Sequence, residues 1–427
     1  MTKLPRNVIR SVPGIGWRDE QLAEQRERLA AQKEELDAQR LEIKKQEKQV
    51  AAQAQELAEQ SAVLAKSESQ LAKSRAKNLR DAEAHEVDIR KTKSETRKFI
   101  SAATQSTPSF HRSLLSWRRV APTLTQIDPG HALAYNQIPF KLHNYRLAKS
   151  HGIPTPEILA VWESLEDIDL TQMPEKFVLK SDCGASGRGV LPLRKLDTDS
   201  FELVDGQAQY TRESAIEHLR GHEEAGNVSG PYFVEGFLDQ PEGGPIPDDV
   251  KIYAFFGEVT MTLLRHVDTH GLHGDQRRRY VSGAGEDLGR VTSMGEIDAS
   301  IEVPRDYAQM VAMARHLSRA VGVGFARVDF YQTSSGPVLG EITRAPGGKQ
   351  TYRPEHDKFM GQTWDEANAR LDLDVMRGRP AGRLYGTHEA ENIYPQSHWS
   401  HGLAEMESRD RVQSCQVWCE TGGSTNA

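Results

Sequence analysis

The chain has only 3 cysteines among its 427 residues and no hydrophobic run long enough to cross a membrane. A membrane-spanning helix needs about 18 or more consecutive apolar residues, and the first eight residues lack the apolar stretch of a secretory signal peptide. So few cysteines favour a reducing compartment over a disulfide scaffold. We therefore expect a cytoplasmic protein without a transmembrane segment.

The motifs of several large enzyme classes are also missing. The sequence has neither the Gly-x-Ser-x-Gly motif of serine hydrolases nor the Walker loop of many nucleotide-binding proteins. Cys415 and Cys419 have no histidine pair at zinc spacing beside them, which argues against a structural metal there. The formal net charge of −7 and the sequence pI of about 6.1 argue against nucleic acid as the main partner.

Glycine and proline are absent from Trp17 through Thr107, although the whole chain contains 34 glycines and 20 prolines. Eight successive heptad positions in this segment predict a coiled coil at residues 18–100. We expect it to join copies of the chain into a homo-oligomer, most simply a parallel dimer. The heptad positions hold Leu22, Leu29, Leu36, Ile43, Val50, Leu57, Leu64 and Leu71.

The second core position of each heptad is polar. Three residues after each aliphatic come Gln25, Gln32, Gln39, Gln46, Gln53, Gln60, Ser67 and Ser74. A half-polar seam weakens association and restricts the register of the helices. The alternative is a single charged helix without a partner, although so long a solitary helix gains little tertiary support.

Two neighbouring hydrophobic runs, residues 325–331 and 338–343, carry polar side chains at alternate positions. Because strand side chains alternate between faces, these can all point to one side of a hairpin. Carboxylates on such a face favour a bound Mg²⁺ with a substrate phosphate beside it. The alternative is a solvated outer face whose arginine and aspartate only pair with each other. The polar positions are Arg327, Asp329, Glu341 and Thr343.

Further upstream, residues 175–193 predict a strand that ends in Lys180, a glycine-rich turn and a returning strand. Gly184, Gly187 and Gly189 would let backbone N–H groups approach an anion, and the lysine would add a point charge beside it. An ordinary tight turn explains the same glycines. Together the two segments favour a nucleotide site in which the glycine-rich hairpin covers the nucleotide and the carboxylate hairpin binds a metal ion beneath it.

With these segments in view, the sequence resembles the ATP-grasp enzymes. The resemblance is strongest to the TupA-like branch, which is associated with teichuronopeptide and surface-polysaccharide biosynthesis. It covers about residues 135–370 and implies an α+β fold in which two α+β lobes sandwich ATP. The matching segments, in the order of the family, are residues 161–170, 173–180, 247–259, 327–331, 340–343 and 353–361.

The resemblance implies nucleotide-binding roles for seven residues: Lys141, Lys180, Gly187, Gly189, Glu235, Asp249 and Lys251. The three lysines match cations that contact phosphate, and the glycines belong to the loop over the phosphates. Glu235 stands at the position where the family binds adenine, and Asp249 stands where it binds ribose.

The resemblance also implies the catalytic and metal-binding residues. Arg327 would lie against the transferred phosphoryl group, and Lys180 would assist it. Asp329 and Glu341 would bind magnesium. Thr343 stands where many ATP-grasp enzymes have asparagine, and the TupA-like branch has threonine there as well.

The activity implied by the resemblance is an ATP- and Mg²⁺-dependent ligase, with Mn²⁺ as the alternative metal. It would join a carboxylate to an amine through an acyl phosphate, adding amino acids or amines to a cell-surface glycan or peptide precursor. Such transfer needs cations and metal ligands, not a nucleophilic side chain. Two alternatives stay open: a kinase that phosphorylates a sugar-type acceptor, and a coiled-coil scaffold that binds nucleotide without catalysis.

The composition divides the chain into parts of different character. Gly/Pro-free helical sequence comes first, a short linker follows, and the remaining length suffices for one two-lobed catalytic domain. Beyond that domain the periodicity is lost, and we expect an irregular extension whose last residues are disordered. The expected parts are an N-terminal segment (1–17), the coiled coil (18–100), a linker and lead-in (101–135), the catalytic domain (136–372) and the extension (373–427).

Overall fold

The computed structural model describes residues 15–100, 107–184, 187–240, 246–267, 276–293, 295–347, 351–402 and 409–420. It separates the chain into two compact units, Met1–Gln105 and Ser106–Ala427. We refer to them as the N-terminal unit and the C-terminal unit. No helix in these described ranges combines the length and the apolar character needed to cross a membrane.

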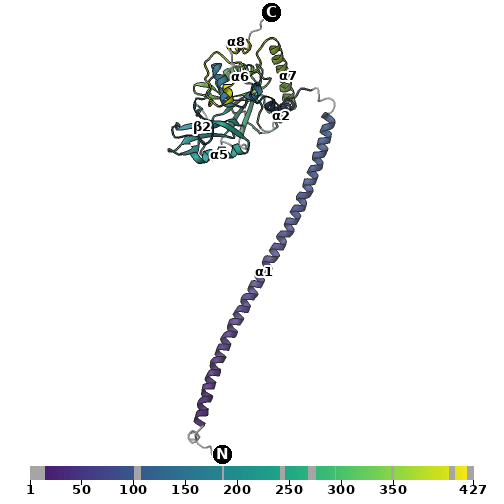
Figure 1. The fold of residues 1–427 in the computed structure, drawn as a ribbon. Coiled ribbons are helices and arrows are strands. Elements are labelled where there is room, and N and C mark those ends of the chain that lie inside the picture. Colours follow the sequence, from purple (N-terminus) through teal and green to yellow (C-terminus); the bar gives the residue numbers. More distant parts are fainter. Residues whose placement is uncertain are drawn as a thin grey trace, which may run out of the picture. The chain divides into compact units, whose positions relative to one another are not determined.

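The N-terminal unit is one continuous helix of 86 residues, α1 (Ile15–Ile100), as Figure 1 shows. At 1.5 Å per residue it is about 130 Å long. The aliphatic side chains at its heptad positions are exposed in the single chain, from 48% at Leu22 to 65% at Leu29 and Leu57. The side chain of Ile43 is not among those that the structure describes. The predicted helix is therefore confirmed, and its association into a coiled coil stays a prediction.

The first lobe of the C-terminal unit is a six-stranded antiparallel sheet in the order β1-β6-β2-β3-β4-β5. One helix, α5 (Arg212–Glu224), begins in a capping box at Thr211 and packs its apolar side against Phe177 and Phe201. The strands are β1 (Ile158–Trp162), β2 (Lys176–Gly184), β3 (Val190–Lys195), β4 (Ser200–Leu203), β5 (Gln209–Thr211) and β6 (Val228–Gly236).

The second lobe is another six-stranded sheet, in the order β10-β9-β8-β7-β11-β12. Helix α6 (Tyr307–Val321) buries one side against it, and the short α3 (Ala134–Gln137) and α4 (Lys141–Ser150) join the same core. The strands are β7 (Asp249–Phe255), β8 (Glu258–Val267), β9 (Gln276–Val281), β10 (Glu296–Ile297), β11 (Ala326–Thr333) and β12 (Gly336–Thr343).

The lead-in expected at residues 101–135 contains a helix that the sequence pattern did not reveal. Helix α2 (Phe110–Ile127) starts at Ser109, whose side chain accepts a hydrogen bond from the Arg112 N–H. It packs on α7 (Pro354–Met376). Its first residue, Phe110, is fully buried, with its ring 5.0 Å from Phe325 and 5.4 Å from Trp364. The lead-in is thus part of the core.

The extension expected at residues 373–427 also belongs to the C-terminal unit. Helix α7 ends four residues beyond the expected boundary, and the irregular chain that follows contains η2 (Trp399–His401) and α8 (Arg409–Trp418). Arg383 is only 1% exposed and donates to the Asn144 side chain at 2.9 Å. The predicted disorder at Gly422–Ala427 lies outside the described residues.

The structure joins Cys415 of α8 and Cys419, the residue after the end of that helix, in a disulfide, with Cα atoms 5.1 Å apart. The sequence-based expectation of reduced cysteines is therefore wrong for this pair in the structure. The physical reason is proximity, because residues four apart on a helix share one face. Cys183 is a free thiol.

The burial of Phe110 generates a stability prediction. Phe110→Ala should lower the free energy of unfolding by about 3–5 kcal/mol, because it removes the ring at the centre of an aromatic cluster. Leu115→Ala, on the exposed side of the same helix, should change it by less than about 0.5 kcal/mol. Urea unfolding of the two variants measures both values, and equal small effects would show that α2 is not part of the core.

Candidate active site

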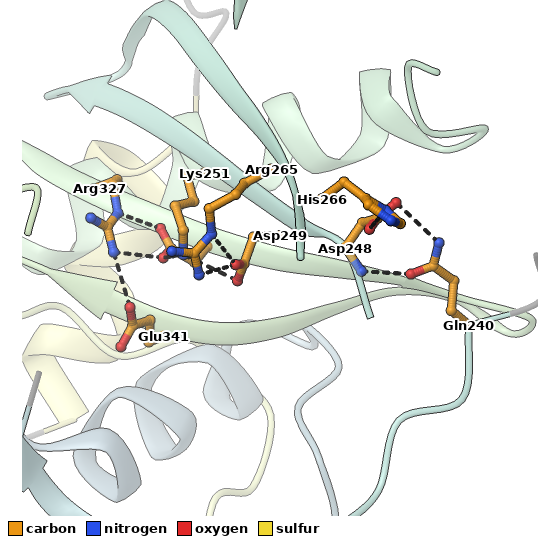
Figure 2. Close-up of polar contacts among 9 residues, drawn as sticks. Gln240, Asp248, Asp249, Lys251, Arg265, His266, Arg327 and Glu341 are labelled. Carbon is orange, nitrogen blue, oxygen red and sulfur yellow. Dashed lines mark hydrogen bonds and ion pairs between the residues drawn. The ribbon is translucent and has the colours of Figure 1, made fainter. Parts of the chain in front are cut away.

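One face of the second sheet carries a row of alternating charges, which Figure 2 shows. The antiparallel register places Lys251 of β7 opposite Asp329 of β11, and Asp329 opposite Glu341 of β12. Arg327 lies two residues from Asp329 on the same strand and therefore on the same face. The alternation predicted from the sequence thus brings Arg327, Asp329 and Glu341 together, and Lys251 of the neighbouring strand joins them.

Arg327 contacts both carboxylates on its side of this row. Its Nε and Nη2 donate to the two oxygens of Asp329, both at 2.7 Å, and Nη2 also donates to Glu341 at 3.0 Å. A bidentate arginine–carboxylate pair holds both groups in one plane. Lys251 Nζ donates to the same aspartate at 2.7 Å, so that the Asp329 carboxylate lies between two cations.

The row continues to Asp249 and Arg265. Lys251 Nζ donates to Asp249 at 3.1 Å, and Arg265 contacts the same carboxylate through Nε at 2.7 Å and through Nη2. The row, from Arg265 to Glu341, therefore contains three cations and three carboxylates. The sequence reading missed Arg265, because a bulge between Tyr253 and Ala254 shifts the β7–β8 register that brings it opposite Asp249.

These charges survive burial because they are paired. Burial alone would raise the pKa of Asp329, but Arg327 and Lys251 outweigh it and hold that pKa well below its usual range. Burial likewise opposes the charge on Arg327, whose pKa is nevertheless raised by Asp329 and Glu341. Arg327 and Asp329 are therefore both charged at neutral pH, and each depends on its neighbours for charge compensation.

A second ion pair lies on the first sheet. Lys180 of β2 pairs with Glu235 of β6, and both side chains are buried. The Tyr145 hydroxyl of α4 donates to Glu235 at 2.9 Å and also lies 2.8 Å from the Gly340 carbonyl of β12. The glutamate that the resemblance assigns to adenine binding thus contacts a lysine and a tyrosine, and the tyrosine links the two lobes.

Tyr331 connects the pair to the row. Burial raises the pKa of the Tyr331 hydroxyl well above its usual range. The negative charges of Asp249, Glu341 and Asp329 raise this pKa further, and Glu235 adds a smaller effect. A Cβ on Gly340 would lie 2.5 Å from the tyrosine ring, so that only glycine fits there. Tyr145 thus places the Lys180–Glu235 pair next to β12, the strand that carries Glu341.

Lys141 lies at the start of α4 and donates to the backbone carbonyls of Ser181 and Asp182, at 2.9 and 3.1 Å. Burial lowers its pKa, and Glu341 partly opposes that shift. The predicted phosphate-contacting lysine is therefore held against the end of β2 in this structure.

The sequence reading also missed the side-chain role of Asp182. This fully buried carboxylate accepts hydrogen bonds from the Leu142 N–H at 2.8 Å and from the Tyr394 hydroxyl at 2.7 Å. Burial raises its pKa to about 6, against the lowering effect of those hydrogen bonds. Tyr394 comes from the extension, so a segment expected to be irregular supports the end of the strand that carries Lys180. No local motif signals this contact.

The glycine-rich turn has a positive φ of 74° at Gly187 and 68° at Gly189. A Cβ on Gly189 would lie 2.4 Å from Ser181 Oγ, whereas one on Gly187 would meet nothing within 4 Å. Gly189 is thus required by packing, and Gly187 by its backbone conformation. Residues 185 and 186 lie outside the described residues. A role of these glycines toward phosphate stays a prediction.

The carboxylates at the end of the row suit a hard divalent cation. Glu341 is 32% exposed at its side chain and contacts Arg327 through one oxygen only. Beyond it, the Thr343 hydroxyl is buried without a hydrogen-bond partner among the described residues, opposite Arg327 in the register. Carboxylate and hydroxyl oxygens are donors that Mg²⁺ and Mn²⁺ accept, so Asp329, Glu341 and Thr343 fit such an ion by chemistry.

Comparison with known proteins agrees with this architecture. The family described as TupA-like ATPgrasp matches residues 115–364, which is more than half of the chain. No curated protein matches the chain.

Several solved structures resemble the chain at low identity. D-alanine–D-alanine ligase from Bacillus anthracis, complexed with ATP, shares 13% identity over 61% of this chain and 76% of that chain, with a TM-score of 0.37. The ATP-grasp ligase PsnB, complexed with its minimal precursor, shares 17% identity over 61% and 73%, with a TM-score of 0.31. D-alanyl-alanine synthetase A from Vibrio cholerae shares 14% over 57% and 67%, with a TM-score of 0.35.

Two sheet-containing lobes, one with the buried ion pair and the other with the charged row, are the architecture of an ATP-grasp protein. Within that class, the chain belongs to the TupA-like ATP-grasp family. The fold and the family expected from the sequence motifs are confirmed.

Asp329 is buried and Glu341 is partly exposed, so their substitution should change the free energy of unfolding by different amounts. Asp329→Asn should lower the free energy of unfolding by about 3–5 kcal/mol at neutral pH, because it leaves Arg327 and Lys251 without their shared anion. Glu341→Gln removes one partly exposed contact and should cost less than about 1 kcal/mol.

The pH dependence of this difference follows from the depressed pKa of Asp329. A carboxylate with a depressed folded-state pKa stabilises the fold above its unfolded pKa of about 3.9, and loses that contribution as the pH falls further. The deficit of Asp329→Asn in urea unfolding should therefore shrink below about pH 4. A deficit that is the same at all pH values would contradict the ion-pair account.

Proposed function

We propose that the chain is an ATP- and Mg²⁺-dependent ligase that joins a carboxylate to an amine and forms ADP. The observation that carries the proposal is the buried, fully paired row of charges in a member of the TupA-like ATP-grasp family. Three cations and three carboxylates contact one another in the row, and an anionic substrate with its metal ion would exchange ionic partners with them.

Nucleotide binding would use the cations of both lobes. Lys141, Lys180 and Lys251 are proposed to contact phosphates, with Gly187 and Gly189 in the turn above them. Lys180 now pairs with Glu235, so phosphate binding would compete with that carboxylate and free it for the base. Asp249, held by Lys251 and Arg265, would accept hydrogen bonds from the ribose hydroxyls.

Metal binding is proposed for Asp329, Glu341 and Thr343, and the bound ion would neutralise phosphate charge during transfer. Glu341 is the most accessible of the three because one of its oxygens is not engaged by Arg327. A metal at Asp329 would share that carboxylate with Arg327 and Lys251, which keeps the carboxylate ionised.

The proposed reaction has two transfers. A carboxylate oxygen of the substrate attacks the γ-phosphorus of ATP, and ADP leaves to give an acyl phosphate. The amine then attacks the acyl carbon, inorganic phosphate leaves, and the amide forms after the amine loses a proton. Arg327, with its fixed planar fork, would stabilise the transferred phosphoryl group and the oxyanion of the second step. Lys180 would assist from the other lobe.

The substrate class rests on resemblance to the TupA-like branch. We propose that the acceptor or donor is a precursor of a cell-surface glycan or peptide, joined to an amino acid or another amine. The arginines of β9 bind acids and carbonyls of this chain, as Arg277 does with Asp298 at 2.9 Å.

Removal of the accessible metal carboxylate tests the activity. Glu341→Gln should lower the rate of ADP release in the presence of Mg²⁺ and an amino-acid mixture by roughly 100-fold or more, the size expected when one electrostatic contact to a transition state is lost. EDTA should abolish release in the parent, and Mg²⁺ should restore it.

The matched control is Glu286→Gln, which removes an exposed carboxylate outside the row. It should release ADP at the parent rate. If Glu341→Gln also keeps the parent rate, the metal assignment at β12 is wrong.

We further propose that α1 associates with a second copy of itself as a parallel coiled coil. The support is the row of exposed aliphatics at heptad spacing, with Leu36 at 51% and Leu64 at 63% exposure in the single chain. Burying such a row is the main stabilisation that a long amphipathic helix can gain.

Deletion of residues 1–104 tests this proposal. The full-length chain should be a dimer in light scattering, and the truncated chain a monomer that still binds ATP in calorimetry, because the row and the ion pair lie in the C-terminal unit. A monomeric full-length chain at micromolar concentration would contradict the dimer. A truncated chain unable to bind ATP would show that α1 contributes to the site.

A further inference from the structure

Two histidines and two cysteines converge on the side of the C-terminal unit formed by α4, α6 and α8. His151 follows the last residue of α4, His316 lies on α6, Cys415 lies on α8, and Cys419 follows the last residue of α8. The ligand-capable atoms of His151, His316 and Cys415 all lie within 4.8 Å of one another. The Cys419 sulfur is not one of these three atoms but is bonded to that of Cys415.

The distances resemble those of a tetrahedral zinc centre. His316 Nε2 lies 2.9 Å from His151 Nδ1, and Cys415 Sγ lies 3.6 Å from the same nitrogen. In a tetrahedron with Zn–N near 2.05 Å and Zn–S near 2.3 Å, the nitrogens are about 3.3 Å apart and nitrogen and sulfur about 3.6 Å apart. Small side-chain shifts therefore suffice to place one ion between them.

The surroundings orient the first histidine for this role. His151 Nε2 lies 2.9 Å from the Leu384 carbonyl, which can only accept a hydrogen bond, so Nε2 carries the proton. Its Nδ1 then presents a lone pair to the cluster. Metal-ligating histidines usually donate their other N–H to a carbonyl or carboxylate in this way. Ala320 and Leu384 enclose the sulfurs, and both cysteines are almost fully buried.

We propose that His151, His316, Cys415 and Cys419 bind a structural Zn²⁺ when the two cysteines are reduced. The disulfide and the metal centre are alternative states of the same two sulfurs. Two electrons and two protons, supplied by a thiol or phosphine reductant, convert the disulfide to two thiols. Zinc binding then releases the thiol protons and gives the Cys₂His₂ ligand set of a closed structural site.

Such a centre would fix the end of the chain to the nucleotide-binding core. Helix α8 would be tied to α6 and to the end of α4, the helix that begins with Lys141. The segment between α7 and α8 supplies Leu384 to the centre and Tyr394 to Asp182. The linear spacing around the cysteines hides the site, because His151 lies 264 residues away from Cys415.

Metal analysis of the full-length chain tests the proposal. The protein is reduced with a phosphine, stripped with a chelator and assayed for three free thiols. Zn²⁺ is then titrated against a chromophoric chelator, with excess Mg²⁺ present to occupy carboxylate sites. The parent should bind one zinc per chain. Cys415→Ser and His316→Gln should each weaken binding by about 100-fold or more, since even the loss of an outer-shell partner typically costs 10–100-fold.

Matched controls are Cys183→Ser and His222→Gln, which change a cysteine and a histidine outside the cluster and should keep the parent affinity for zinc. Co²⁺ bound to the parent should show thiolate charge-transfer absorption and the bands of tetrahedral coordination, a readout that does not depend on folded variants. The proposal is overturned if the reduced parent binds no zinc, if Cys415→Ser binds it as the parent does, or if the disulfide resists the reductant.

Discussion

The carboxylate of Asp329 lies buried between Arg327 and Lys251, and the arrangement of the second lobe depends on this contact. Moving a charge out of water costs several kcal/mol unless partners compensate it. The fold supplies those partners by register, because three antiparallel strands bring their side chains to the same face. The other members of the row, from Arg265 to Glu341, then balance one another in turn. The fold thus holds three cations and three carboxylates of the row in mutual contact.

This constraint also shapes the contact between the lobes. The first lobe contributes its own buried pair, Lys180 and Glu235, and Tyr145 joins that pair to the backbone of β12 at Gly340. Tyr331 lies within the field of the carboxylates on both sheets. A nucleotide that enters between these groups would exchange one set of ionic partners for another. Folding therefore already pairs the charges that such a nucleotide would meet.

Much of the site could be predicted from the sequence, and the failures have physical reasons. The Arg327–Glu341 hairpin was predictable because a short turn joins two runs with period-two alternation. Arg265 was not, since a one-residue bulge decides which side chain of β8 meets Asp249. Asp182 and Tyr394 were missed because their contact joins residues 212 positions apart. The pairing of Lys180 with Glu235 depends on the β2–β6 register, which no local pattern determines.

The central claim is that a carboxylate is activated by ATP, and trapping the activated species tests it most directly. Hydroxylamine attacks acyl phosphates in place of the natural amine and gives hydroxamates. Incubation of the full-length chain with ATP, Mg²⁺, hydroxylamine and a panel of amino acids and sugar acids should yield hydroxamate, ADP and inorganic phosphate in equal amounts. Phosphorus NMR and mass spectrometry measure all three. ADP accompanied by a phosphate ester, with neither hydroxamate nor inorganic phosphate, would contradict the claim and indicate a kinase.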